Sequence, residues 1–141
     1  MSDRTLILIK PDAVKRGLIG AILSRFEDKG FKIVKLKMMK LSEKDARRFY
    51  DVHMNKPFFN DLVSFITSGP IVAALIEGKN AVETVRKMIG PTNPKEAPKG
   101  TIRGDFAKSI TENAIHASDS PESFLREYEV IFGSNQNSIY V

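Results

Sequence analysis

The sequence contains no cysteine, and only two of its 141 residues are histidine. The lack of cysteine excludes disulfide scaffolds, thiolate metal sites and cysteine nucleophiles. Imidazole chemistry can come only from His53 or His116. Because these two histidines are far apart in the sequence and no thiolate is available, we expect no tetrahedral metal site built by protein ligands alone.

Long apolar runs are also missing. The most apolar stretch, residues 71–76, is six residues long, whereas a membrane-spanning helix needs about 20. The N-terminus lacks the basic region and the apolar run of a secretory signal. We therefore expect a cytoplasmic protein with no membrane partner.

The common phosphate-binding and nucleophile motifs are absent as well. The sequence has no Gly-x-x-x-x-Gly-Lys-Ser/Thr, no Gly-x-Gly-x-x-Gly and no Gly-x-Ser-x-Gly. An ATP-dependent enzyme with this sequence would have to bind phosphates in another way.

The composition is that of an ordinary folded domain, with 42% hydrophobic and 28% charged residues. The length predicts one domain over residues 1–141. The net charge of +5 suggests an anionic partner. This surplus lies at the N-terminal end, because residues 1–40 carry ten Lys/Arg and four Asp/Glu.

Apolar periodicity predicts alternating strands and helices. Strands are expected at residues 5–9, 31–40, 71–76 and 113–116, and helices at 18–29, 42–51, 57–66, 80–88 and 120–132. This order favours an α+β fold, a two-layer βαββαβ sandwich with a four-stranded sheet, over a doubly wound sheet. The lysine-rich strand 31–40 is typical of a guarded sheet edge.

Residues 90–104 fit neither periodicity and contain three glycines and three prolines. Long loops without regular structure inside a compact domain are usually functional or disordered. Because three prolines restrict the backbone, we expect a functional loop.

His116 is the first candidate for catalysis. A lone histidine at a strand end more often hydrogen-bonds to the backbone than reacts. Here, however, Asn113, Ser118 and Asp119 surround it, and a helix start follows. Imidazole is substantially neutral at pH 7 and can serve as base, ligand or nucleophile. Glu127, two turns along that helix, could orient the second ring nitrogen, although a lone glutamate is more often a solvated surface charge.

His53 lies in an aromatic cluster with Tyr50, Phe58 and Phe59. Aromatic residues at such spacing are usually core residues. One at an open rim could instead stack on a nucleobase. Both interpretations remain open, as does a magnesium ion held mainly by ligand phosphates with one carboxylate such as Asp119.

Five segments, in order, resemble the nucleoside diphosphate kinase family over essentially the whole chain. They are Lys-Pro-Asp at 10–12, Pro-Phe-Phe at 57–59, Ser-Gly-Pro at 68–70, Gly-Thr-Ile-Arg-Gly-Asp-Phe at 100–106 and Asn-Ala-Ile-His-Ala-Ser-Asp-Ser at 113–120. Ala117, Lys56 and Ala13 depart from the commonest family residues, but none of these changes removes a catalytic group.

The resemblance implies a reversible ping-pong transfer of the γ-phosphate from a nucleoside triphosphate to a nucleoside diphosphate through a phosphohistidine on His116, with Mg²⁺ bound to the phosphates. It implies catalytic roles for Lys10, Tyr50, Asn113, Ser118 and Glu127. The implied nucleotide-binding residues are Lys10, Phe58, Leu62, Arg86, Thr92, Arg103, Ile110 and Asn113.

The family fold is ferredoxin-like, the βαββαβ sandwich predicted above, with an antiparallel sheet. Family members form hexamers or tetramers of dimers, so strand 31–40 would be paired in a homo-oligomer. The rival hypothesis is a non-catalytic basic module that binds nucleotides or nucleic acid. It accounts for the charge and for Phe58, but it leaves His116 and Glu127 without a role. Nucleic-acid binding remains conceivable as a side activity.

Overall fold

The computed structural model describes residues 3–133 and contains one four-stranded sheet in that part of the chain. The strands are β1 (Asp3–Ile9), β2 (Lys32–Met39), β3 (Ile71–Gly78) and β4 (Ile115–Ala117). The α-helices are α1 (Pro11–Lys15), α2 (Ile19–Asp28), α3 (Glu43–Phe49), α4 (Phe59–Ile66), α5 (Ala81–Ile89), α6 (Ile102–Phe106) and α7 (Pro121–Ile131).

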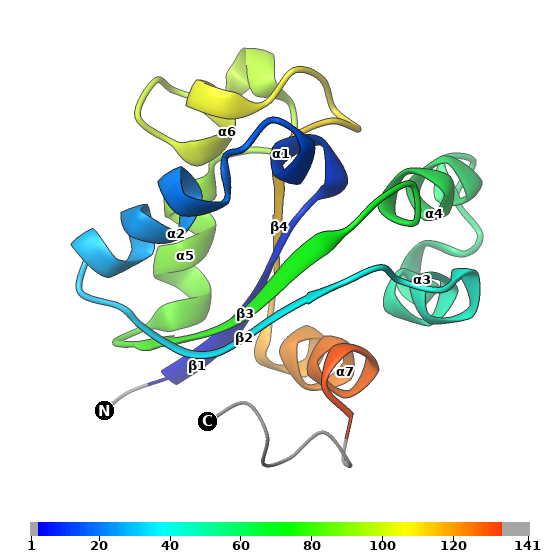
Figure 1. The fold of residues 1–141 in the computed structure, drawn as a ribbon, viewed down its shortest axis with the longest axis horizontal. Coiled ribbons are helices and arrows are strands. Elements are labelled where there is room, and N and C mark those ends of the chain that lie inside the picture. Colours follow the sequence, from blue (N-terminus) through cyan, green and yellow to red (C-terminus); the bar gives the residue numbers. More distant parts are fainter. Residues whose placement is uncertain (1–2, 134–141) are drawn as a thin grey trace.

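The sheet has the strand order β2-β3-β1-β4, and every neighbouring pair is antiparallel (Figure 1). With helices in the connections from β1 to β2 and from β3 to β4, this is the predicted βαββαβ arrangement, so the α+β fold prediction is confirmed. β2 is an edge strand, as its lysines indicated, and β4 is the other edge.

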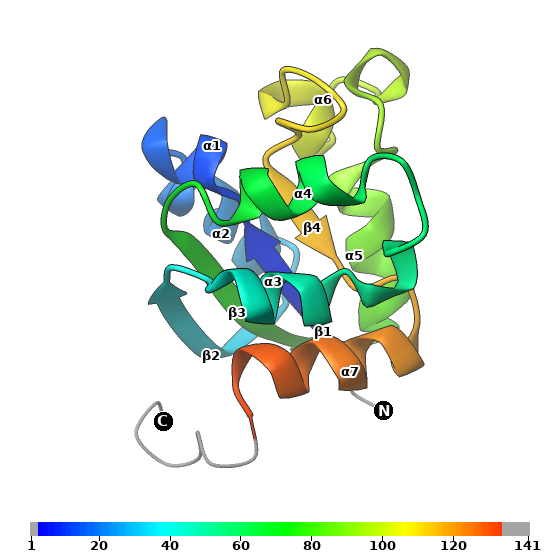
Figure 2. The ribbon, with the colours of Figure 1, turned by 90° about the vertical axis from the view of Figure 1, so that its right-hand side faces the viewer.

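Helices cover both faces of the sheet, so α3, α4 and α7 add a further layer to the two layers that the sequence predicted. On one face, Ile7 and Ile9 of β1 pack with apolar residues of α2 and α5. On the other face, Leu6 and Leu8 pack with residues of α3, α4 and α7, which lie together in Figure 2. Because consecutive side chains of a strand point to opposite faces, burial on both sides requires the uninterrupted apolar run of β1.

The ends of several helices follow their sequence signals. Ser42 accepts a hydrogen bond from the Asp45 N–H, and Ser120 accepts one from the Ser123 N–H, so both serines are N-caps. Asn80 precedes α5 as expected, but it adopts a left-handed conformation and its side chain makes no cap hydrogen bond. The helix predicted from Pro57 begins at Phe59 instead.

Two short helices were not predicted. α1 and α6 have five residues each, which is less than two turns and too short for apolar periodicity to appear. The loop 90–104 also contains a single 3₁₀ turn, Pro94–Glu96, and the first residues of α6. No helix among residues 3–133 is long and apolar enough to cross a membrane.

Candidate functional site

The antiparallel pairing of β1 and β4 brings the predicted site residues Lys10 and His116 to the same end of the sheet. His116 on β4 pairs with Leu8, and Ile115 pairs with Ile9, the last residue of β1. Lys10 follows directly, and its N–H donates to the Ala114 carbonyl at 2.9 Å. The Lys10 Nζ donates to the Asn113 Oδ1 at 2.8 Å. Residues about 100 positions apart in the sequence thus meet at one end of the sheet.

A cavity of about 480 Å³ opens at this junction. All predicted site residues except Ser118 and Glu127 line it. Those that line it are Lys10, Tyr50, Phe58, Leu62, Arg86, Thr92, Arg103, Ile110, Asn113, His116 and Asp119. Ser118 and Glu127 lie behind the histidine, where both are buried.

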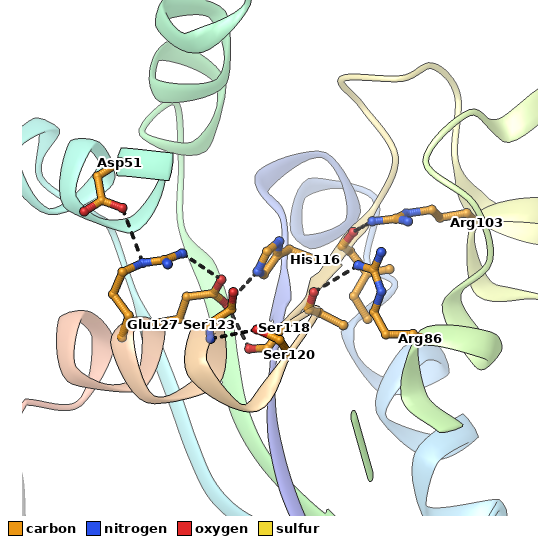
Figure 3. A network of polar contacts seen from close by, with 11 residues as sticks. Asp51, Arg86, Arg103, His116, Ser118, Ser120, Ser123 and Glu127 are labelled. Carbon is orange, nitrogen blue, oxygen red and sulfur yellow. Dashed lines mark hydrogen bonds and ion pairs between the residues drawn. The ribbon is translucent and has the colours of Figure 1, made fainter. Parts of the chain in front are cut away.

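His116 is held from behind by a carboxylate (Figure 3). Its Nε2 lies 2.8 Å from the Glu127 Oε1, and the Ser118 hydroxyl donates to the same oxygen, also at 2.8 Å. Because a carboxylate only accepts hydrogen bonds, it favours a proton on Nε2 and leaves the lone pair of neutral imidazole on Nδ1. The imidazole side chain is 20% exposed and the Glu127 side chain 4% exposed. The arrangement therefore presents Nδ1 as the nucleophilic atom.

Arg126 contacts the second oxygen of that carboxylate. Its Nη2 lies 3.3 Å from the Glu127 Oε2, and its Nε lies 3.4 Å from an Asp51 carboxylate oxygen. Asp51 belongs to a 3₁₀ turn, Asp51–His53, that follows α3. The guanidinium thus connects α7 to the segment between α3 and α4. Arg126 was not predicted, because a charged residue on a helix surface carries no sequence signal for such a bridge.

Two arginines approach β4 from its unpaired edge. The Arg103 Nη2 donates to the Ile115 carbonyl at 2.8 Å, and the Arg86 Nη1 donates to the Ala117 carbonyl at 3.2 Å. The outward carbonyls of an edge strand have no neighbouring strand to bond. Here they hold guanidinium groups on either side of His116, and both groups line the cavity.

The loop 90–104 supplies the second support of Arg103. The Arg103 Nη1 donates to the Gly90 carbonyl at 2.8 Å. Gly90 has a φ of +86°, and a Cβ added there would lie 2.8 Å from the Thr101 Oγ1. Thr101 caps α6 by accepting a hydrogen bond from the Gly104 N–H at 3.0 Å. This close approach requires glycine at position 90.

Burial changes the acidity of three polar groups in the cavity. It lowers the pKa of Lys10 to about 8, together with the nearby charge of Arg103. Burial also lowers the pKa of Arg103 to about 10, with a contribution from Arg86. It raises the pKa of the Tyr50 phenol, with Glu127 acting in the same direction, so Tyr50 stays a hydrogen-bond donor at neutral pH.

The aromatic cluster divides into core and rim. Phe59 is buried, whereas Phe58 is 44% exposed at the mouth of the cavity. Leu62 and the exposed Ile110 line the cavity with it. The ring centroids of His53 and Phe58 are 5.5 Å apart. These groups form an apolar slot next to the polar end of the cavity.

Four further residues that were not predicted at the site line the cavity: His53, Asp61, Thr111 and Ala117. Asp61 follows Phe58 by three positions at the start of α4, so the helical repeat could have placed both on one face. Thr111 lies two positions before Asn113 in the segment that precedes β4. For His53 the sequence left core packing and nucleobase contact open, and the structure places it at the cavity wall.

One carboxylate of the cavity suits a cation carried by phosphates. A hydrogen bond from Ser123 lowers the pKa of Asp119, and the charges of Arg86 and His116 act in the same direction. Within residues 3–133, no cluster of three or more His, Cys, Asp or Glu side chains could hold a metal by itself. A single ionised carboxylate fits Mg²⁺, which keeps waters and takes phosphate oxygens as ligands.

Comparison with known proteins agrees with this geometry. The family model described as "Nucleoside diphosphate kinase" matches residues 3–137. A protein named nucleoside diphosphate kinase from Staphylothermus marinus is 58% identical over 135 residues, which cover 96% of this chain and 96% of that protein. Its namesake from Thermoplasma volcanium is 55% identical over 134 residues, covering 95% and 91%.

Solved structures agree in fold. The nucleoside diphosphate kinase of Aquifex aeolicus has a TM-score of 0.92 and 48% identity, covering 95% of this chain and 97% of that one. A halophilic nucleoside diphosphate kinase from Halobacterium salinarum, solved in complex with CDP, has a TM-score of 0.92 and 43% identity, covering 96% and 91%. None of these matches supports a non-catalytic binding module.

Proposed function

Because the chain belongs to the nucleoside diphosphate kinase family, a family of nucleotide phosphotransferases, we propose that His116 carries the phosphate. The γ-phosphate of a nucleoside triphosphate moves to His116 and then to a nucleoside diphosphate. The observation that carries this proposal is the orientation of the imidazole. Glu127 occupies Nε2, and Nδ1 is left for a cavity lined by Lys10 and two arginines.

In the first half-reaction, the Nδ1 lone pair attacks the γ-phosphorus, a P–N bond forms, and the bond from the γ-phosphorus to the bridging oxygen breaks. The nucleoside diphosphate leaves with that electron pair. The imidazole ring becomes cationic as it bonds to phosphorus, and the buried Glu127 carboxylate at 2.8 Å stabilises this charge. The second half-reaction is the reverse, with another nucleoside diphosphate as the acceptor.

The cations around the His116 Nδ1 neutralise the negative charge of the transferred phosphoryl group. A loose phosphoryl-transfer transition state asks the protein mainly for positioning and for positive charge. Arg103 and Arg86 are held on either side of His116 by carbonyls of β4, and Lys10 is held by Asn113. Tyr50 stays protonated and donates a hydrogen bond to the phosphate.

The nucleoside end of the substrate lies in the apolar slot. Phe58 stacks on the base, Leu62 and Ile110 contact it, and Thr92 and Asn113 bind the phosphate and ribose oxygens. Stacking uses the π-face of the base and not its edges, so one slot accepts several bases. The CDP complex of the Halobacterium salinarum relative agrees with a nucleoside diphosphate as substrate.

Asp119 is the residue that would hold Mg²⁺ together with the nucleotide phosphates. When bound, the ion supplies positive charge to the phosphate oxygens. Asp119 is kept ionised by the hydrogen bond from Ser123 and adjoins the cations of the cavity.

The assembly is proposed to be a homo-oligomer, a hexamer or a tetramer of dimers, in the cytoplasm. β2 is an edge strand with exposed Leu36 and Met38, and these features favour pairing with a second copy. Nucleic-acid binding is proposed as no more than a side activity of a chain with a net charge of +5.

The test is incubation with ATP labelled at the γ-position, followed by a chase with a different nucleoside diphosphate. We expect an acid-labile, base-stable phosphoprotein that gives its label to the diphosphate. His116→Ala should not take up the label, whereas His53→Ala should still take it up. A label that persists in His116→Ala would overturn the proposal.

A further inference from the structure

Asp12 is a buried carboxylate outside the wall of the catalytic cavity. It is the second residue of α1 and is 7% exposed. Its Oδ2 accepts a hydrogen bond from the Ala114 N–H at 3.1 Å, and its Oδ1 has no hydrogen-bond partner among residues 3–133. Burying a carboxylate with one oxygen unpaired costs folding free energy. The proposed phosphate transfer gives Asp12 no role that would offset this cost.

The partner of Asp12 is a strained residue. Ala114 has a φ of +74°, one of two positive values among the non-glycine residues described. The Ile115 N–H donates to the Asn113 carbonyl at 2.9 Å across it. A hydrogen bond from residue i+2 to residue i with a positive central φ is the classic γ-turn, which is rare and strained. Such strain persists only where the surroundings hold it in place.

The turn lies between the functional groups of the site. Asn113, whose side chain holds the Lys10 Nζ, precedes Ala114, and His116 follows it by two positions. Both peptide groups of Ala114 are fixed by the β1–α1 junction, because the Asp12 carboxylate accepts its N–H and the Lys10 N–H donates to its carbonyl. The position of Asn113 relative to Lys10 therefore depends on Asp12.

Asp12 also balances the charge around Lys10. The charged or titratable side chains around Lys10 are Asp12 on α1, Arg103 on α6, Arg86 on α5, Tyr50 after α3, His116 on β4, and His53, Asp61 and Asp119 at the cavity wall. Burial and the charge of Arg103 lower the pKa of Lys10 to about 8, and the charge of Asp12 opposes them. Burial raises the pKa of Asp12 in turn, and the charge of Lys10 opposes that rise.

We infer that Asp12 is a positioning residue for phosphoryl transfer: its carboxylate fastens the Asn113–Ala114 turn to the end of β1 and provides the counter-charge of the Lys10 ammonium. This inference rests on the proposed role of Lys10 at the transferred phosphate. It assigns to the third residue of the Lys-Pro-Asp segment a function separate from that of the first.

The test compares three substitutions at this position by the pH dependence of kcat/KM between pH 6 and 9.5, which reports groups of the free enzyme. Asp12→Asn keeps an oxygen acceptor for the Ala114 N–H but removes the charge. Asp12→Glu keeps the charge but displaces the carboxylate, and Asp12→Ala removes both. Asp28→Asn, on the exposed end of α2, removes the same charge elsewhere and serves as the control.

In the wild type, kcat/KM should fall as Lys10 loses its proton above about pH 8. Asp12→Asn should move this alkaline limb to lower pH by about 0.5 unit or more. Asp12→Glu should leave the limb in place and lower the rate, and Asp12→Ala should lower the rate about tenfold or more at every pH. Asp28→Asn should match the wild type.

Lys10→Arg separates this inference from the proposed function. A guanidinium loses its proton well above the Lys10 ammonium, even where burial lowers its pKa to about 10 as at Arg103. The limb near pH 8 should therefore disappear in whatever activity Lys10→Arg retains. A limb that survives in Lys10→Arg contradicts the proposed role of Lys10. If Lys10→Arg abolishes the limb but Asp12→Asn leaves it at the wild-type pH, the inference about Asp12 is overturned and the proposed role of Lys10 stands. Urea midpoints of all variants identify any loss that is due to unfolding. If Asp12→Ala does not fold, Asp12→Asn still tests the charge and Asp12→Glu still tests the position of the carboxylate.

Discussion

Glu127→Gln is the substitution that most directly probes how the histidine is activated. The glutamine side chain has the same shape, but it removes a buried negative charge 2.8 Å from the His116 Nε2. A hydrogen bond to a charged group contributes about 1.5–3 kcal/mol. The stabilisation of the cationic ring in the transition state should fall by a similar amount, which corresponds to a loss of about 10- to 100-fold in rate. An amide that donates to Nε2 would also place the proton on Nδ1 and add to the loss.

The assay is single-turnover phosphorylation of the enzyme by saturating ATP in a rapid-quench instrument. Glu127 does not line the cavity, so the apparent affinity for ATP should change less than twofold while the rate falls. Ser118→Ala removes only a neutral donor to the same carboxylate and should cost a few-fold. Glu122→Gln, an exposed glutamate in the first turn of the same helix, is the matched control and should behave as the wild type.

A Glu127→Gln enzyme within twofold of the wild-type rate would refute the reasoning. It would mean that the charge behind the imidazole does not act on the transfer. A change in ATP affinity with an unchanged rate would contradict it as well, because it would place Glu127 at the nucleotide.

Three further predictions follow from the geometry. Arg103→Ala should lower kcat by about 100-fold or more. Phe58→Ala should mainly raise KM, since an exposed stacking ring contributes about 1–3 kcal/mol to binding. Steady-state kinetics with two nucleoside diphosphates separate the two effects. Gly90→Ala should destabilise the fold by about 1–3 kcal/mol because residue 90 has a positive φ and an added Cβ would contact Thr101 closely. Gly20→Ala, in α2 with open space around an added Cβ, should stabilise the fold by about 0.5–1 kcal/mol. Urea unfolding at one protein concentration measures both changes. The pKa of Lys10 is about 8 in the fold and 10.5 ordinarily, so between these values the unfolded chain binds more protons than the folded chain. The contribution of Lys10 to the free energy of unfolding should therefore rise with pH in this window. The difference in unfolding free energy between the wild type and Lys10→Met should change across the same window.

The long elements were predictable because their physical causes act locally. The apolar run of β1, the stripe that ends at Gly30 and the serine caps at Ser42 and Ser120 all specify structure within a few residues. The topology then followed from the order of the elements. α1 and α6 were not predicted because neither is long enough to show a helical repeat.

The site was predictable as a set of residues through the family resemblance, but the supports of those residues were not. The arginine contacts to the carbonyls of Ile115 and Ala117 depend on β4 being an edge strand, which only the strand order reveals. The contact of Asp12 with Ala114 spans 102 positions. No local pattern reports a hydrogen bond of that kind, because it exists only after β1 and β4 have paired.

The central claim is that the phosphate is carried by the Nδ1 atom of His116. The most direct measurement is to phosphorylate the enzyme with ATP, digest it under alkaline conditions and identify the phosphohistidine isomer and its peptide by mass spectrometry and ³¹P NMR. We expect a single phosphohistidine, substituted at Nδ1, in the peptide that contains His116. Phosphate on Nε2, or on His53, would contradict it.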